Sequence, residues 1–97
     1  MSIEITVVFD VVPDRFEATA KAFAGLCAAT RAEKGALRFD AFRAEGDEHA
    51  IVLVEEWADQ AAIDLHMKEP YVAAFLAEVD GAYAAAPRVL RLRPLDA

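Results

Sequence analysis

The chain has 97 residues, enough for one domain spanning 1–97, and 57% of them are apolar, a share high enough to favour burial against a second copy. A net charge of −7 with scattered Lys and Arg disfavours nucleic acid and anionic membranes as partners, and no segment is long and apolar enough to span a bilayer. Cys27 is the only cysteine, so no intrachain disulfide is possible, and we expect a cytoplasmic protein.

The first third of the chain predicts a strand followed by a helix. Apolar residues alternate from 3 to 12, a pattern typical of a strand. Asp14 and Glu17 are spaced like a capping box, which predicts that the helix begins there. We expect the helix to close near Gly35, since glycine commonly follows a helix end. Its apolar stripe consists of Phe16, Ala20, Phe23, Cys27 and Thr30.

A hairpin is predicted next. Residues 36–44 alternate again, and residues 49–57 form a second, largely apolar run. The polar segment 45–48 contains a glycine, so we expect the two strands to be antiparallel neighbours. In the strand of residues 36–44, one face is predicted to carry Leu37, Phe39 and Ala41, and the opposite face Arg38, Asp40 and Phe42.

The last third predicts two short helices and a final strand. Asp59 is placed to cap a helix that runs to about Lys68. Pro70 suits the first turn of a second helix, where its missing N–H costs nothing. Pro87 ends the helical region, and residues 89–95 alternate as a strand.

The element order is therefore β-α-β-β-α-β, with the two short helices counted as one helical region. Right-handed crossovers convert this order into an α+β, ferredoxin-like fold, an antiparallel sheet with its helices on one face. The opposite face is left bare although its strands carry apolar residues on both sides. We expect a second copy of the sheet to cover it, giving a homodimer.

Glu55, Glu56 and Trp57 end the third predicted strand and are the densest group of reactive side chains in the chain. Strand side chains alternate, so Glu55 and Glu56 must point to opposite faces of the sheet. A carboxyl group that enters an apolar layer has a raised pKa and is suited to proton transfer. The alternative is that each glutamate forms an ion pair at the interface with an arginine such as Arg38 or Arg91. We place Glu56 at the dimer interface.

His66 follows in the next predicted helix. A neutral imidazole there can exchange a proton with a substrate lodged between helix and sheet. The alternative is a structural histidine that caps the end of its helix. The other histidine, His49, lies at the hairpin, distant from His66 in the sequence, so the chain has no close pair of histidines. We therefore predict no metal site.

Four segments resemble the antibiotic biosynthesis monooxygenase (ABM) domain family. They are residues 30–39, residues 55–59, residues 62–66 and residues 70–75. The resemblance covers nearly the whole chain in the order that the family has. It implies a dimeric α+β barrel, in which two ferredoxin-like sheets pack face to face.

The resemblance also separates the branches of the family. In the antibiotic and haem branches a tryptophan stands where this chain has His66, and the antibiotic branch has an asparagine where this chain has Ala62. The haem branch has a ligand histidine in the last helix, where residues 74–76 are Ala-Phe-Leu. The quinol monooxygenase and autoinducer-2 phosphate isomerase branches are the most similar, through residues 37–40, and residues 86–88 also resemble the isomerase branch.

From this resemblance we expect a cofactor-independent monooxygenase that oxidises a quinol or another electron-rich aromatic. His66 is the candidate base, and Glu55 orients or shares the proton. The residues expected to line the substrate cavity are Phe39, Trp57, Tyr71 and Phe75. Two alternatives remain, isomerisation of a small phosphorylated hydroxy-ketone by the same base and a dimeric module that binds a hydrophobic ligand without turnover.

Overall fold

The computed structural model describes residues 1–96. The strands are β1 (Ile3–Asp10), β2 (Ala36–Arg43), β3 (Ala50–Trp57) and β4 (Arg88–Leu92). The helices are a 3₁₀ turn (Pro13–Arg15), α1 (Phe16–Thr30), α2 (Gln60–Met67) and α3 (Pro70–Glu78). This is the predicted element order.

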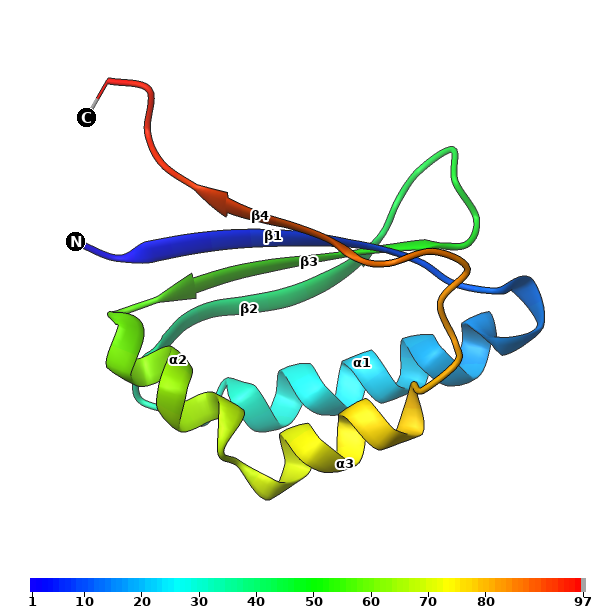
Figure 1. Cartoon of the computed structure of the whole chain (residues 1–97), viewed down its shortest axis with the longest axis horizontal. Coiled ribbons are helices and arrows are strands. Elements are labelled where there is room, and N and C mark those ends of the chain that lie inside the picture. The colour runs from blue at the N-terminus through cyan, green and yellow to red at the C-terminus, as the bar shows by residue number, and fades with distance from the viewer. Residues whose placement is uncertain (97) are drawn as a thin grey trace.

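The four strands form one antiparallel sheet in the order β2-β3-β1-β4. All three α-helices lie on one side of it, and the two chain ends lie at the same end of the molecule (Figure 1). The predicted ferredoxin-like α+β fold is therefore confirmed. The dimer remains a prediction.

The core lies between the sheet and the helices. Odd-numbered residues of β1 and β3 face inward, among them Val7 and Leu53, which are adjacent across the two strands. Phe9 packs edge-on against Phe23 of α1, with ring centroids 4.8 Å apart, and Phe23 packs in the same way against Phe75 of α3 at 4.9 Å. Aromatic edge contacts of this kind hold α1 and α3 against the sheet.

Three local predictions were wrong. The first is the end of α1, which lies at Thr30 and not near Gly35. Asp14 does not cap α1, because Pro13 opens a 3₁₀ turn and α1 begins after Arg15 without a side-chain cap. Arg15 instead donates to the carbonyl oxygens of Asp80 and Glu78, at 2.7 and 3.1 Å, at the end of α3. Leu37 is not on the inner face, because the register of β2 shifts between residues 36 and 38 and leaves Leu37 55% exposed. A β-bulge of this kind is common near the end of a strand.

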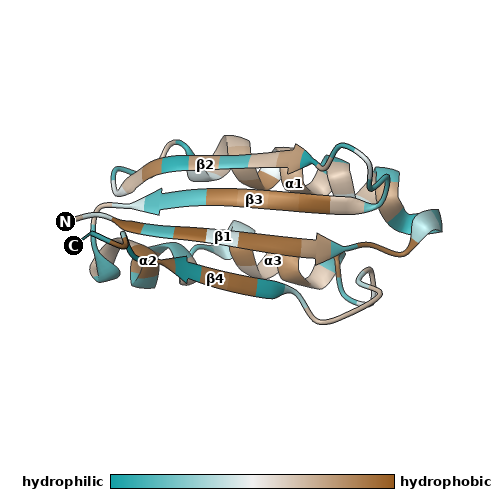
Figure 2. Cartoon of the chain, turned by 90° about the horizontal axis from the view of Figure 1, so that it is seen from above, coloured by the Kyte–Doolittle hydropathy of each residue, from teal (hydrophilic) through white to brown (hydrophobic). Residues whose placement is uncertain are grey.

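The outer face of the sheet carries exposed apolar side chains. Phe42, Leu90 and Leu92 are 47, 39 and 47% exposed, and their strand partners place them with the outward-facing residues. Half-buried Val8, Val52 and Val54 lie between them on β1 and β3, and Figure 2 shows the apolar residues running along the middle of the sheet. A contiguous apolar face with polar ends is typical of an interaction surface.

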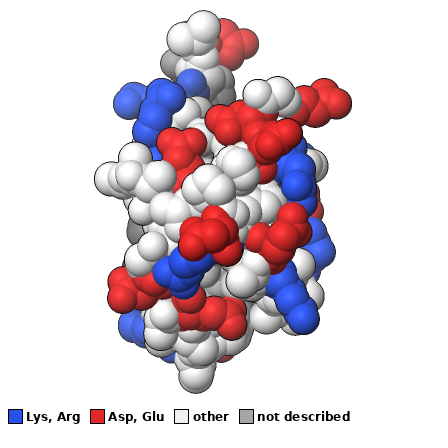
Figure 3. All heavy atoms as spheres, turned by 90° about the vertical axis from the view of Figure 1, so that its right-hand side faces the viewer, with Lys and Arg blue, Asp and Glu red and all other residues white. Residues whose placement is uncertain are grey.

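Charges are distributed without a basic cluster on the face that Figure 3 shows, where acidic and basic side chains are interspersed. In the part of the chain that the structure describes, no helix combines the length and apolar character needed to cross a membrane.

Candidate functional site

The end of β3 supplies two inward-facing side chains of the site, Glu55 and Trp57. The register places Glu55 between Phe39 of β2 and Ile5 of β1, on the face that the helices cover. Glu56 points to the other face, where its carboxylate accepts a hydrogen bond from Ser2 Oγ at 2.6 Å. The predicted separation of the two glutamates is confirmed.

Helix α2 brings His66 over this end of β3. Its first turn is capped by Asp59, whose Oδ1 accepts from the Ala62 backbone N–H at 2.9 Å, as predicted. His66 lies one turn after Ala62 and is 6% exposed. Its ring centroid is 4.8 Å from that of Trp57 and 5.6 Å from that of Phe39. The candidate base, the tryptophan and one predicted lining residue therefore meet in one cluster.

Glu33 completes the cluster and was not singled out from the sequence. Its Oε2 lies 2.8 Å from His66 Nδ1 and also accepts a hydrogen bond from the Tyr71 hydroxyl. Glu33 belongs to the turn between α1 and β2, 33 residues before His66. The only hint in the sequence is an acidic residue in the short turn just before the strand that carries Phe39.

Glu55 is partly buried within this cluster, and its surroundings perturb its pKa. Its Oε1 accepts from Trp57 Nε1 at 2.7 Å. Burial raises the pKa of Glu55, and the indole hydrogen bond and the attraction of His66 oppose that rise. Within residues 1–96 neither arginine pairs with Glu55, because Arg38 pairs with Asp40 and Arg91 donates to Gln60. An ion pair across an interface stays a prediction.

Three polar atoms of the cluster, on His66, Glu55 and Glu33, have no hydrogen-bond partner among the described residues. His66 Nε2 and Glu55 Oε2 have no hydrogen-bond partner within residues 1–96, and neither is among the fully buried unpaired atoms. One is a ring nitrogen and the other a carboxyl oxygen, so together they can accept and return a proton. Within the same residues, no three His, Cys, Asp or Glu side chains are grouped so that they could hold a metal ion.

The predicted lining residues divide between two places. Phe39 and Trp57 contact His66, and the Tyr71 ring centroid is 6.2 Å from that of His66. Phe75 lies one turn beyond Tyr71 and packs against Phe23 instead. Tyr71 and Phe75 also line a groove of about 550 Å³ between α1 and α3, so Tyr71 connects this groove with the His66 cluster.

The fold and the site define an antiparallel α+β domain with a carboxylate–imidazole–indole cluster between sheet and helices. The model of the family described as "Antibiotic biosynthesis monooxygenase" matches residues 2–78. The chain is 31% identical over 68 residues to YcnE of Bacillus subtilis, which carries a provisional monooxygenase name; the match covers 70% of this chain and 72% of YcnE. The chain belongs to the antibiotic biosynthesis monooxygenase family.

Solved structures agree on the fold. The structure of Rv0793 from Mycobacterium tuberculosis has a TM-score of 0.89 and 26% identity, and the match covers 100% of this chain and 98% of that one. The structure of PA3566 from Pseudomonas aeruginosa has a TM-score of 0.89 and 23% identity, covering 97% of this chain and 94% of that one. At 23% identity the second likeness concerns the fold alone.

Proposed function

We propose that the protein is a monooxygenase that oxidises a quinol or another electron-rich phenol with O₂ and without a bound cofactor, in the cytoplasm. Family membership supports oxygenase chemistry. One observation supports the place of the reaction within the fold. His66 Nε2 and Glu55 Oε2 are unpaired polar atoms in a cluster that packs against Trp57 and Phe39. A phenolic hydroxyl needs a base that accepts its proton, and an imidazole is the side chain best suited to that step near neutral pH.

In the proposed reaction His66 Nε2 takes the proton of a quinol hydroxyl. The electron-rich anion passes one electron to O₂, and the resulting radical and superoxide combine to form a C–O bond. The hydroperoxide then loses water, so that a hydroquinone and O₂ yield a hydroxyquinone and H₂O. Glu55, whose burial favours its protonated form, supplies a proton to the departing oxygen.

The experiment is O₂ uptake with a panel of quinols in the presence of a chelator, in wild type, His66→Ala and His49→Ala. His49 is the matched control, because it lies at the β2–β3 turn against Phe16, away from the cluster. We expect His66→Ala to lose roughly 10²–10⁴-fold in kcat/KM, the usual contribution of a general base, and His49→Ala to match wild type. Unchanged uptake in His66→Ala would show that His66 is not the base.

Isomerisation is the second candidate, because a raised-pKa carboxyl beside an imidazole is also an acid–base pair for enolisation. Its test is exchange of solvent deuterium into a small phosphorylated hydroxy-ketone. Exchange that depends on His66, with no O₂ uptake from any quinol, would replace the oxygenase by an isomerase. Saturable ligand binding without either reaction would identify a binding module.

We also propose that the outer face of the sheet pairs with a second copy. The exposed Phe42, Leu90 and Leu92 on this face support the proposal. Sedimentation of Phe42→Lys should show a weakened dimer, since a Lys ammonium loses its hydration in an apolar contact. Leu76→Lys is the control, because Leu76 is similarly exposed, at 54%, but lies on α3. A wild-type chain that sediments as a monomer would contradict the proposal.

A further inference from the structure

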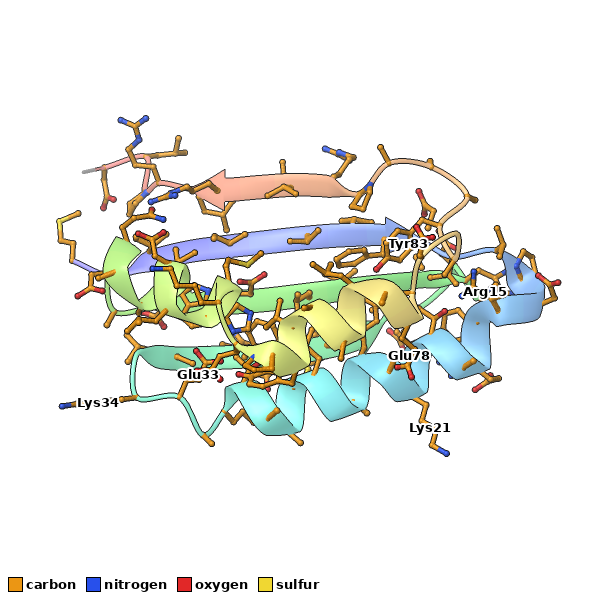
Figure 4. All side chains as sticks on the ribbon, turned by 60° about the horizontal axis from the view of Figure 1, so that its bottom comes forward. Arg15, Lys21, Glu33, Lys34, Glu78 and Tyr83 are labelled. Atoms are coloured by element: carbon orange, nitrogen blue, oxygen red, sulfur yellow. The ribbon has the colours of Figure 1, made fainter. Side chains whose placement is uncertain are left out.

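Glu33 was not among the predicted site residues, yet its carboxylate lies at the centre of the hydrogen bonds around His66. Its side chain is 16% exposed, and one oxygen, Oε2, receives both His66 Nδ1 and the Tyr71 hydroxyl. The neighbouring Lys34 extends away from the molecule, whereas Glu33 lies by the junction of α2 and α3 (Figure 4). Two side chains from two different helices thus converge on one carboxylate.

The backbone around Glu33 is held in place independently of this carboxylate. The Glu33 N–H donates to the Thr30 carbonyl at 2.9 Å, and the Ala58 N–H donates to the Gly35 carbonyl at 2.9 Å. Gly35 also lies so close to Ala62 that a Cβ at position 35 would overlap the Ala62 methyl group. The turn that carries Glu33 is therefore fixed against the start of α2, one turn before His66.

The geometry points to Glu33 as the positioning residue of His66, which sets the tautomer of the imidazole; this inference rests on the proposed role of His66 as a base. An ionised carboxylate can only accept hydrogen bonds, so the nitrogen that faces it must carry the proton. His66 Nδ1 is that nitrogen. The neutral ring then presents Nε2 as an acceptor, the atom that takes the substrate proton in the proposed reaction.

Tyr71 has a supporting part in this arrangement. Its hydroxyl donates to the same oxygen that His66 contacts, so this oxygen is held between two donors from α2 and α3. When His66 takes a proton from substrate, the imidazolium faces an acceptor-only carboxylate across a 2.8 Å hydrogen bond. A histidine fixed in this way is preorganised as a base and needs no rearrangement before the proton transfer.

The tautomer can be measured without any substrate, by ¹⁵N NMR of the neutral imidazole at alkaline pH. We expect wild-type His66 to carry its proton on Nδ1, with His49 as an internal reference that does not touch Glu33. Glu33→Leu removes the acceptor and should shift the proton toward Nε2, whereas Glu33→Gln keeps an acceptor oxygen and should retain Nδ1–H. Lys34→Leu, the same new side chain on the adjacent exposed position, should leave His66 unchanged.

Two results would overturn the inference. One is a wild-type His66 protonated on Nε2, a measurement that needs no variant to fold. The other is an Nδ1–H tautomer that persists in a folded Glu33→Leu protein. With an active quinol substrate, Glu33→Leu should lower kcat at least about tenfold with KM within roughly twofold, since a base in the wrong tautomer binds but does not react. If no quinol reacts, the proposed function fails, while the tautomer measurement still decides the role of Glu33.

Discussion

Gly35 is the residue whose replacement tests the architecture of the site most directly. Its φ is not in the left-handed region, so an alanine there meets no backbone strain of its own. The obstacle is steric, because the new Cβ would overlap the Ala62 Cβ and lie 3.4 Å from the Ala62 Cα. Neither atom belongs to a flexible side chain, so the turn and α2 must move apart.

The cost of Gly35→Ala follows from two opposing effects. Overpacking of a well-packed contact costs about 1–3 kcal/mol, and the lower entropy of the unfolded chain returns about 0.4–1 kcal/mol. The mid-range net loss is about 1.3 kcal/mol, which lowers Tm by roughly 5–10 °C in a domain of this size. Gly25→Ala is the matched control, because nothing lies within 4 Å of its Cβ position in α1, and it should gain up to about 1 kcal/mol.

A double-mutant cycle then identifies the contact. Ala62→Gly alone should cost about 1 kcal/mol through helix propensity, and it also removes the methyl group that a new Cβ at position 35 would meet. The double variant should therefore be more stable than the sum of the single losses by at least about 1 kcal/mol. Denaturant unfolding followed by circular dichroism at one fixed protein concentration measures this. Additivity within about 0.5 kcal/mol would refute the steric explanation.

Three further predictions concern single side chains. Burial raises the pKa of Glu55 above its usual 4.5 in the folded chain, so the contribution of Glu55 to stability is complete at low pH and is lost as the pH rises through the folded-state pKa. Glu55→Gln should therefore gain stability relative to wild type as the pH rises through that range. A difference in the free energy of unfolding that stays constant with pH, measured by denaturation, would contradict this. Thr30 Oγ1 is buried without a partner in the described residues, so Thr30→Val should be neutral or up to about 1 kcal/mol more stable in urea, and a clear loss would indicate a hidden partner. Asp59→Ala should cost about 1 kcal/mol in thermal unfolding because it removes the cap of α2, whereas an unchanged Tm would show that the cap contributes nothing.

The order of the elements could be predicted because it depends on the local periodicity of apolar residues and on residues that begin helices. Alternation in residues 3–12 and the Asp59 and Pro70 signals correspond to β1, α2 and α3. The capping box at Asp14 failed because a neighbouring proline imposed a competing turn. Leu37 failed because a one-residue bulge reverses the alternation, and no local pattern announces a bulge.

The site could be predicted only in part, for a related reason. Glu55, Trp57 and His66 lie close together in the chain, so the strand-to-helix junction brings them together. Glu33 reaches His66 only because the turn after α1 packs against α2. That contact depends on tertiary packing between elements distant in sequence, and the acidic residue in the turn before β2 does not by itself indicate its partner.

The position of Trp57 makes its fluorescence an intrinsic probe of the candidate site. Trp57 is the single tryptophan and is 0% exposed; its indole donates to Glu55, and its ring centroid is 4.8 Å from that of His66. All tryptophan fluorescence of the protein therefore comes from one indole that contacts both Glu55 and His66. Any event that alters their protonation, admits water or places a ligand between them must change that emission, without a label and without knowledge of the substrate.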